Sequence, residues 1–273
     1  MKKTLASLAL LGLAASAAHA YALWGVNDAN ELVKFESTNP GTVYSSTAIT
    51  GLNDAFSSIV DFDYNPNDGY FYGVDNNAYI YRFNTKGQAT LLSDTFLPSG
   101  YDADMAYDPF YSNFRWVSDM AENVALETDG STSYATDFFY GSGDANEGAA
   151  PYLSGIGIDP DFGELFVIDP ELDILAQSFD PDGGELFTIG SLGLDITGYS
   201  SLMVDGNGNL LASLSVDGLT SGLYSIDLMD GSATLVGDFG QGINAIAVPE
   251  PRTYAALAGV LALAVAAFRR RRA

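Results

Sequence analysis

Cysteine is absent from this 273-residue sequence, and histidine occurs once, as His19. Without cysteine, the chain forms no disulfide and offers no thiolate to a metal ion. Because His19 lies in the N-terminal segment 1–20, the region 21–248 contains no histidine either. This excludes Ser-His-Asp and Cys-His catalysis from that region, together with histidine-ligated zinc or copper and haem with a histidine ligand.

Basic residues are scarce as well. Region 21–248 holds four of them against 34 acidic residues, a net charge of −30; the four are Lys34, Arg82, Lys86 and Arg115. Such a surface repels nucleic acid and anionic membranes, and it favours solubility and contact with divalent cations. A nucleic-acid partner is therefore excluded.

The N-terminal segment, residues 1–20, has the pattern of an export signal. Lys2 and Lys3 precede an apolar run over residues 5–18, and the small residues Ala18 and Ala20 flank the end of the segment. This order predicts a helical secretory signal peptide over residues 1–20, removed by signal peptidase. The folded domain is then expected over residues 21–248, which is long enough to bury a substantial core.

The C-terminal segment, residues 249–273, has a different pattern. An apolar stretch over residues 254–268 precedes four arginines. It is short for a permanent membrane span, which needs about 20 residues, and the arginines favour the cytoplasmic side. A short transmembrane helix that acts as a temporary stop-transfer anchor is the favoured interpretation, and an ordinary tail anchor is the alternative.

This tail resembles the PEP-CTERM sorting signal, in which a Pro-Glu-Pro motif, a short hydrophobic helix and an arginine cluster follow one another. The matching residues are Pro249, Glu250, Pro251, Arg269, Arg270, Arg271 and Arg272. The resemblance implies an exported protein of a Gram-negative cell, held transiently in the inner membrane, cut by an exosortase near the motif and then placed at the cell surface or outside. It also implies an association with exopolysaccharide and biofilm production.

Between the two ends, a unit of four short strand-like runs recurs. In residues 59–94 the runs are rich in β-branched and aromatic residues, and clusters of Asn, Asp, Pro and Gly separate them, as expected for hairpin turns. Equivalent turn positions recur in four copies at Pro66, Pro109, Pro160 and Gly206. A period of about 40–50 residues with four strands is typical of a β-propeller.

The two ends of the domain look like parts of one further repeat. Residues 243–248 resemble a first strand, and residues 21–26, 31–35 and 42–46 resemble the other three. We therefore predict an all-β fold, a propeller of five four-stranded blades closed by pairing of the N- and C-terminal strands, which leaves no free sheet edge at the junction. An open β-sandwich or a six-bladed ring with one degenerate blade are the alternatives.

The innermost strands of a propeller line its central channel, and one position per blade is small or polar there: Asp61, Asp104, Gly155, Ser201 and Asn244. Asp63 and Asp102 add two more carboxylates on the same two adjacent blades. Clustered acids in a confined channel suit a calcium ion held by Asp61 and Asp104, a bound sugar or a water network. Small polar residues also line any narrow water-filled channel, and this second interpretation is slightly favoured.

Two Asp/Asn-rich segments, 63–69 and 205–209, superficially resemble calcium loops. Both lack the glutamate that such a loop needs at its twelfth position, where Val74 and Val216 stand instead. A hairpin turn built by Asn, Asp and Gly is the favoured interpretation of each.

Arg115 is unusual because the equivalent strand positions, Tyr72 and Phe166, are aromatic. A buried cation needs a partner, so we expect a structural ion pair with Asp119 or Glu122 and, as a second role, a ligand contact. The surrounding segment resembles an exported bacterial family of unknown function with propeller-like repeats; the matching residues are Asp108, Pro109, Arg115, Val117, Ser118, Asp119 and Asn123. That resemblance implies no activity.

These features favour an exported, non-enzymatic protein of the cell envelope or extracellular matrix that binds extracellular polysaccharide. A glycoside hydrolase is the alternative, since it needs only two carboxylates about 5–10 Å apart. A calcium-dependent adhesion domain is the second alternative. No motif selects an acid and a nucleophile among the 34 acidic residues, so no catalytic residue is predicted.

Overall fold

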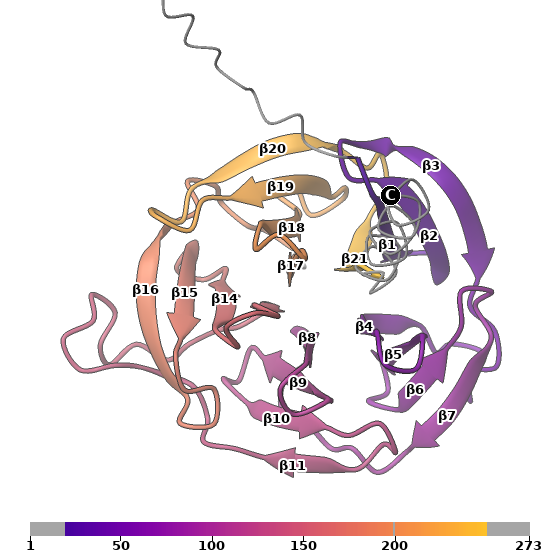
Figure 1. Ribbon diagram of the computed structural model, residues 1–273, viewed down its shortest axis with the longest axis horizontal. Helices are drawn as coiled ribbons and strands as arrows, with labels where there is room; N and C mark the ends of the chain where they lie inside the picture. Colours follow the sequence, from indigo (N-terminus) through magenta and orange to yellow (C-terminus); the bar gives the residue numbers. More distant parts are fainter. Residues whose placement is uncertain (1–19, 199, 250–273) are drawn as a thin grey trace, which may run out of the picture.

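The computed structural model describes residues 20–198 and 200–249, and it arranges them as a ring of five β-sheets around a central axis (Figure 1). This part of the chain contains 21 strands and no helix. The predicted signal helix, the hydrophobic C-terminal helix and the sorting-signal residues from Glu250 onward lie outside the described residues.

Each sheet is one blade, and its strands are named from the channel outward. Blade 1 contains β21 (Ile243–Ala247), β1 (Ala22–Asn27), β2 (Glu31–Glu36) and β3 (Asn39–Ala48). Blade 2 contains β4 (Ile59–Asn65), β5 (Tyr70–Asp75), β6 (Ile80–Phe83) and β7 (Ala89–Ser93). Blade 3 contains β8 (Ala103–Asp108), β9 (Asn113–Ser118), β10 (Asn123–Leu126) and β11 (Thr132–Tyr134).

Blade 4 carries one strand more than predicted. It contains β13 (Gly155–Ile158), β14 (Leu165–Asp169), β15 (Ile174–Ser178), β16 (Glu185–Ser191) and, pairing in parallel with β16, the short β12 (Phe139–Tyr140). Blade 5 contains β17 (Ser200–Val204), β18 (Leu210–Leu214), β19 (Gly222–Ile226) and β20 (Ala233–Asp238). The extra strand comes from the long connection between blades 3 and 4.

The predicted ring closure is confirmed. β21 and β1 are antiparallel neighbours, with Val26 opposite Ala245 and Trp24 opposite Ala247. The last strand of the domain therefore completes the sheet that the first three strands begin. All five sheets are built from strands that lie within residues 20–198 and 200–249.

Apolar side chains pack between neighbouring blades and form the core. Phe62 and Phe71 of blade 2 pack with Ala245 of blade 1, and Tyr72 of blade 2 packs with Trp116 of blade 3. All five side chains are buried. Aromatic residues at strand spacing are thus mainly packing elements here, since burying such a ring stabilises the fold by about 1.5–3 kcal/mol.

Many of the acidic residues shape turns. Asp205 Oδ1 accepts hydrogen bonds of 2.9 Å from the N–H groups of Asn207 and Asn209, and Gly208 takes the positive φ of 78° that the turn requires. Asp108 and Asp159 cap the equivalent turns of blades 3 and 4 in the same way. The prediction of hairpin turns in place of calcium loops is confirmed for residues 205–209.

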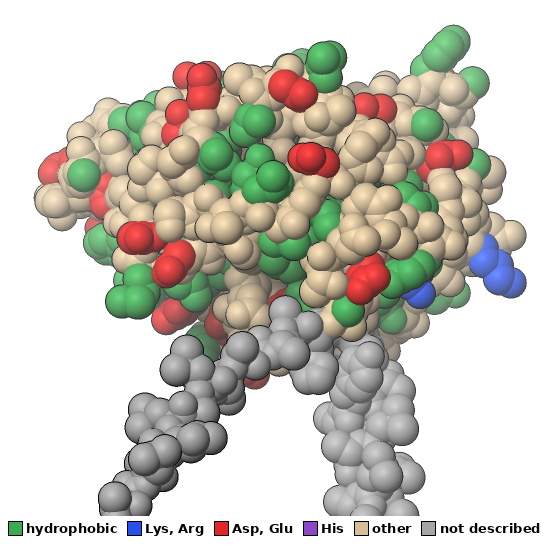
Figure 2. Space-filling view, turned by 90° about the horizontal axis from the view of Figure 1, so that it is seen from above, with side chains coloured by type: hydrophobic (Ala, Val, Ile, Leu, Met, Phe, Trp, Pro, Cys, Tyr) green, Lys and Arg blue, Asp and Glu red, His purple; other side chains and the backbone are tan. Residues whose placement is uncertain are grey.

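Both ends of the described chain lie on one face, here called the terminal face, where the turns after the innermost strands meet. The Tyr21 hydroxyl donates to Asp205 Oδ2 at 2.9 Å, and Val248 lies beside Pro66, Pro109 and Pro160. In Figure 2 acidic side chains are spread over the visible surface, and basic ones lie at one edge. None of the described segments is a helix with the length and hydropathy needed to span a membrane.

Candidate functional site

The predicted channel acids do not form one cluster. Asp61 and Asp104 are buried inside the channel. Asp63 lines a cavity on the terminal face, whereas Asp102 lies just before β8, at the opposite end of the channel, and accepts a hydrogen bond from the Tyr152 hydroxyl. The structure therefore buries two of the four carboxylates and places the other two toward opposite ends of the channel.

Asp104 links three blades across the channel. Its Oδ2 accepts hydrogen bonds from the N–H groups of Ile156 on β13 (3.0 Å) and Leu202 on β17 (2.9 Å). The Ser201 hydroxyl donates to its Oδ1 at 3.2 Å. One buried carboxyl thus satisfies the main chain of two other innermost strands.

Hydrogen bonds from main-chain N–H groups to side-chain oxygens of another blade recur around the ring, because an innermost strand has unpaired N–H groups on its channel edge. Asp63 Oδ2 accepts a hydrogen bond of 2.7 Å from the N–H of Tyr107, in the next blade. Ser201 Oγ accepts one of 3.1 Å from the N–H of Ile246, which joins blade 5 to blade 1. The polar residues of the channel therefore act first as links between blades.

The remaining two channel positions contribute less to the links between blades. Asn244 is half-buried and is the extra residue of a β-bulge, since Ile243 and Ala245 pair with consecutive residues of β1. Gly155 is buried, and a Cβ at this position would lie 3.2 Å from Ile168 Cβ and 3.3 Å from Leu202 Cβ. A continuous ring of five polar side chains is therefore not formed.

The donor set in the channel does not fit calcium. Ca²⁺ takes six to eight oxygen ligands, whereas both oxygens of Asp104 already accept hydrogen bonds and Asp61 accepts one from the Trp116 indole N–H at 3.1 Å. Over residues 20–198 and 200–249, no three acidic or histidine side chains converge as metal ligands.

The two buried carboxyls have raised pKa values. Burial raises the pKa of Asp61 from 3.8 to about 7, the hydrogen bond from Trp116 lowers it and the charge of Asp102 raises it. Burial also raises the pKa of Asp104 well above its usual value, and the Asp61 charge adds to this, while N–H groups including those of Ile156 and Leu202 oppose it. The channel therefore favours protonated carboxyls.

A pH-dependent stability follows from Asp61. Between pH 4 and 7 the folded protein keeps a proton that the unfolded chain releases, so the free energy of unfolding falls as pH rises through this window. The shift of about 3 pKa units corresponds to about 4 kcal/mol. In denaturant unfolding of wild type and Asp61→Asn at pH 4 and pH 8, the variant is expected to gain about 4 kcal/mol relative to wild type at the higher pH. If the free energy of unfolding has the same pH dependence in both proteins, the proton is not held by Asp61.

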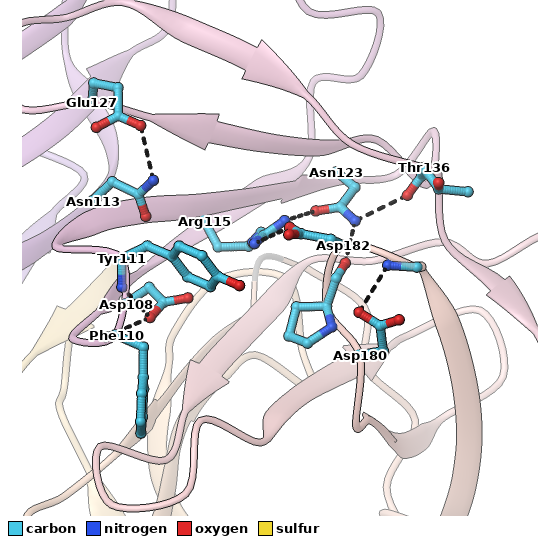
Figure 3. Close-up of polar contacts among 12 residues, drawn as sticks. Asp108, Phe110, Tyr111, Asn113, Arg115, Asn123, Glu127, Thr136, Asp180 and Asp182 are labelled. Carbon is cyan, nitrogen blue, oxygen red and sulfur yellow. Dashed lines mark hydrogen bonds and ion pairs between the residues drawn. The ribbon is translucent and has the colours of Figure 1, made fainter.

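Arg115 on β9 is the centre of a second polar group, between blades 3 and 4 (Figure 3). Its side chain is 3% exposed, its Nη2 lies 2.7 Å from Asp182 Oδ1, and its Nη1 donates to Asn123 Oδ1 at 2.8 Å. Asn123 in turn donates to the carbonyls of Thr136 and Pro181. This network fixes the turn that carries Asp182 against blade 3.

The predicted partners of Arg115 are wrong, although an ion pair is present. Glu122 accepts hydrogen bonds from the N–H groups of Ser99 and Gly100, and Asp119 accepts one from Tyr101. These two acids hold the loop that leads into β8. Sequence proximity favoured them, whereas Asp182 is 67 residues away from Arg115 in the sequence and comes from the next blade.

Small neighbours leave room for the Arg115 side chain. In the strand register Arg115 lies opposite Ala106 on β8 and Ala125 on β10. Ala125 also lines a surface cleft of about 500 Å³ beside the ion pair. The combination of one long cation and two cross-strand alanines is a signal in the sequence that could have located this cleft.

The cleft offers polar groups of several kinds. Ser133, Tyr134 and Thr136 line it together with Arg115 and Asp182. The Asp182 side chain is 59% exposed. The Tyr134 ring lies on the opposite face of β11 from Ser133, and its hydroxyl donates to the Leu97 carbonyl at 3.4 Å. Among the described residues, the hydroxyl groups of Ser133 and Thr136 have no hydrogen-bond partner, so they are available to a ligand. Of this set, the sequence indicated only Arg115.

A second cavity, of about 390 Å³, lies at the channel mouth on the terminal face. Apolar residues dominate its lining, including Leu202, Met203 and Val204, and Asp63 is its carboxylate. Asp63 already accepts the N–H of Tyr107, so the cavity presents few polar groups that could orient a ligand. The cleft at Arg115 is the better candidate for specific recognition.

Five blades around one channel, with the first and last strands paired, define a five-bladed β-propeller. The chain belongs to a protein family described as a domain of unknown function (DUF4394), which matches residues 31–248. This agrees with the resemblance noted from the sequence around Arg115. No curated protein matches the chain by sequence.

Solved structures share the fold at low sequence identity. A structure of the nidogen/laminin complex has a TM-score of 0.56 at 15% identity, covering 83% of this chain and 97% of that one. A gluconolactonase from Xanthomonas campestris has 0.47 at 17% identity, covering 81% of each. An auxiliary nutrient-binding protein from Bacteroides thetaiotaomicron has 0.47 at 12%, covering 81% of this chain and 51% of that one, so the chain spans about half its length. At these identities the likeness concerns the fold alone.

Proposed function

We propose that the protein is an exported, non-enzymatic binding module of the cell envelope or extracellular matrix, and that it binds extracellular polysaccharide. The observation that carries the proposal is the cleft between blades 3 and 4. Hydroxyl groups without a partner among the described residues and a guanidinium–carboxylate pair line this cleft. Planar polar groups such as these bond to sugar hydroxyls.

The location of the protein outside the inner membrane is part of the proposal. The N-terminal segment with Ala18 and Ala20 and the C-terminal Pro-Glu-Pro segment support export, processing by signal peptidase and exosortase, and a transient stay in the inner membrane. Both ends of the described domain lie on the terminal face. A ligand in the cleft between two blades would therefore not compete with processing at either end.

A glycoside hydrolase is the rival function, and one observation favours it. The pKa of Asp61 is raised to about 7, as a general acid requires. However, Asp61 is 4% exposed and hydrogen-bonded to Trp116, inside the channel and away from the cleft. A group that substrate does not reach cannot protonate a leaving group, so binding without hydrolysis is the better-supported function.

A polysaccharide panel tests this choice. Residues 20–249 are expected to be retained on at least one immobilised polysaccharide and to release no reducing ends from it. Ser133→Trp, which places a large side chain at the exposed rim of the cleft, is expected to weaken retention at least about tenfold, because it fills the space that the ligand needs. Thr90→Trp, the same kind of change on the exposed outer strand of blade 2, is the matched control and should be retained as wild type is. Hydrolysis products that disappear in Asp61→Asn would overturn the proposal, and so would the absence of any retention.

A further inference from the structure

We infer that the cleft selects neutral sugars with two adjacent hydroxyl groups, and that Arg115 and Asp182 form the clamp that holds this diol. The inference rests on the proposed function and adds the class of ligand and the residues that choose it. The clamp is defined by the 2.7 Å contact between Arg115 Nη2 and Asp182 Oδ1.

The ion pair leaves bonding capacity on the side of the cleft. One oxygen of Asp182 bonds to Arg115, and among the described residues its Oδ2 has no partner. Arg115 has five N–H donors, and two contacts to side chains of described residues account for two of them. A carboxylate beside a guanidinium thus offers an acceptor and a donor together. Two adjacent hydroxyls match that pair, because each hydroxyl both donates and accepts.

The two residues of the clamp differ in burial, and this difference suits the capture of a ligand. Arg115 is buried and fixed by Asn123, whereas Asp182 is mostly exposed on a turn. The Arg115 side chain is already fixed before the ligand arrives, which lowers the entropic cost of binding. Ser133 and Thr136 then provide hydroxyls for further sugar oxygens.

Charge decides between neutral and acidic sugars. The Arg115 charge is balanced by Asp182, so the cleft has no net positive charge to offer a uronic acid. The domain around it carries 34 acidic and four basic residues, and its field repels polyanions over a Debye length of about 8–10 Å. A buried cation already paired with a carboxylate would have to lose that partner to bind an anionic sugar.

The experiment is calorimetric titration of the full chain with neutral tetrasaccharides (cello-, malto-, manno- and galacto-tetraose) and with tetragalacturonate. At least one neutral sugar is expected to bind, with an affinity that changes less than about twofold between roughly 50 and 500 mM NaCl, and the uronate at least about tenfold more weakly. Ser133→Ala/Thr136→Ala is expected to lose about tenfold in affinity. Asp182→Asn is expected to lose a similar amount, whereas Asp161→Asn, the same charge change on an exposed turn of blade 4, should bind as wild type does.

The outcomes separate this inference from the proposed function. If a neutral sugar binds and the double hydroxyl variant and Asp182→Asn bind it as wild type does, the clamp is wrong and the binding function stands. Tighter binding of the uronate would likewise overturn the choice of neutral ligands. If no sugar binds here and no polysaccharide retains the domain, the proposed function fails and the clamp fails with it. The double variant keeps the test independent of folding, because neither hydroxyl has a partner among the described residues.

Discussion

Asp104→Ala is expected to lower the free energy of unfolding by about 4 kcal/mol, because each buried polar group that loses its partner costs about 1–3 kcal/mol. The change leaves the N–H groups of Ile156 and Leu202 and the hydroxyl of Ser201 without their acceptor inside the channel. A loss of this size is a large part of the total stability of a domain, commonly about 5–15 kcal/mol. Denaturant unfolding of residues 20–249 at acid pH, where burial favours the neutral carboxyl, measures it.

Asp161→Ala is the matched control, because Asp161 is an exposed acid whose carboxylate has no hydrogen bond among the described residues. Its effect should stay within about 0.5 kcal/mol, as for most surface substitutions. A loss below about 1 kcal/mol for Asp104→Ala would mean that the channel carboxyl does not hold the three blades together.

A disulfide across the ring closure is expected to give the largest gain in stability. Val26 and Ala245 are direct partners on β1 and β21, so cysteines placed there lie at the separation that a disulfide needs. Because the chain has no cysteine of its own, Val26→Cys/Ala245→Cys yields a single bond. It closes a loop of roughly 220 residues, for which chain entropy predicts up to about 5 kcal/mol. Thermal unfolding with and without reductant measures the gain.

The single variant Val26→Cys, which loses the same side chain and forms no intramolecular bond, is the control. Oxidation of the double variant should be complete in the folded protein, and reduction should return its melting temperature to about that of the control. Failure of the two cysteines to react in the folded protein would show that the first and last strands are not paired.

The fold could be predicted from the sequence because the turn and strand patterns that indicate it are local and repeated. Turn residues such as Pro66, Pro109 and Pro160 recur at the start of each copy, and residues 243–248 lack the second strand that residues 21–26 supply. Hydrophobic alternation then fixes which side of each strand is buried. The number of blades and the closing pair could therefore be predicted, whereas the fifth strand of blade 4 could not, because Phe139 and Tyr140 are too short a run to stand out.

Only part of the candidate site could be predicted from the sequence, because its side chains come from residues that are far apart in the sequence. Arg115 was recognisable as a cation among aromatic counterparts, but its partner Asp182 belongs to a turn of the next blade. Asp104 was recognisable as a channel residue, yet its bond to Leu202 depends on how narrow the channel is. Neither the twist of the blades nor the channel width can be read from strand spacing. Ser133 and Thr136 were missed for the same reason.

Ligand binding between blades 3 and 4 is the central claim, and a crystal structure of residues 20–249 with a bound neutral tetrasaccharide tests it most directly. We expect sugar density in the cleft, with two adjacent hydroxyls within hydrogen-bond distance of Arg115 and Asp182. Density in the channel beside Asp61 and Asp104, or in the cavity of the terminal face, with an empty cleft, would contradict it.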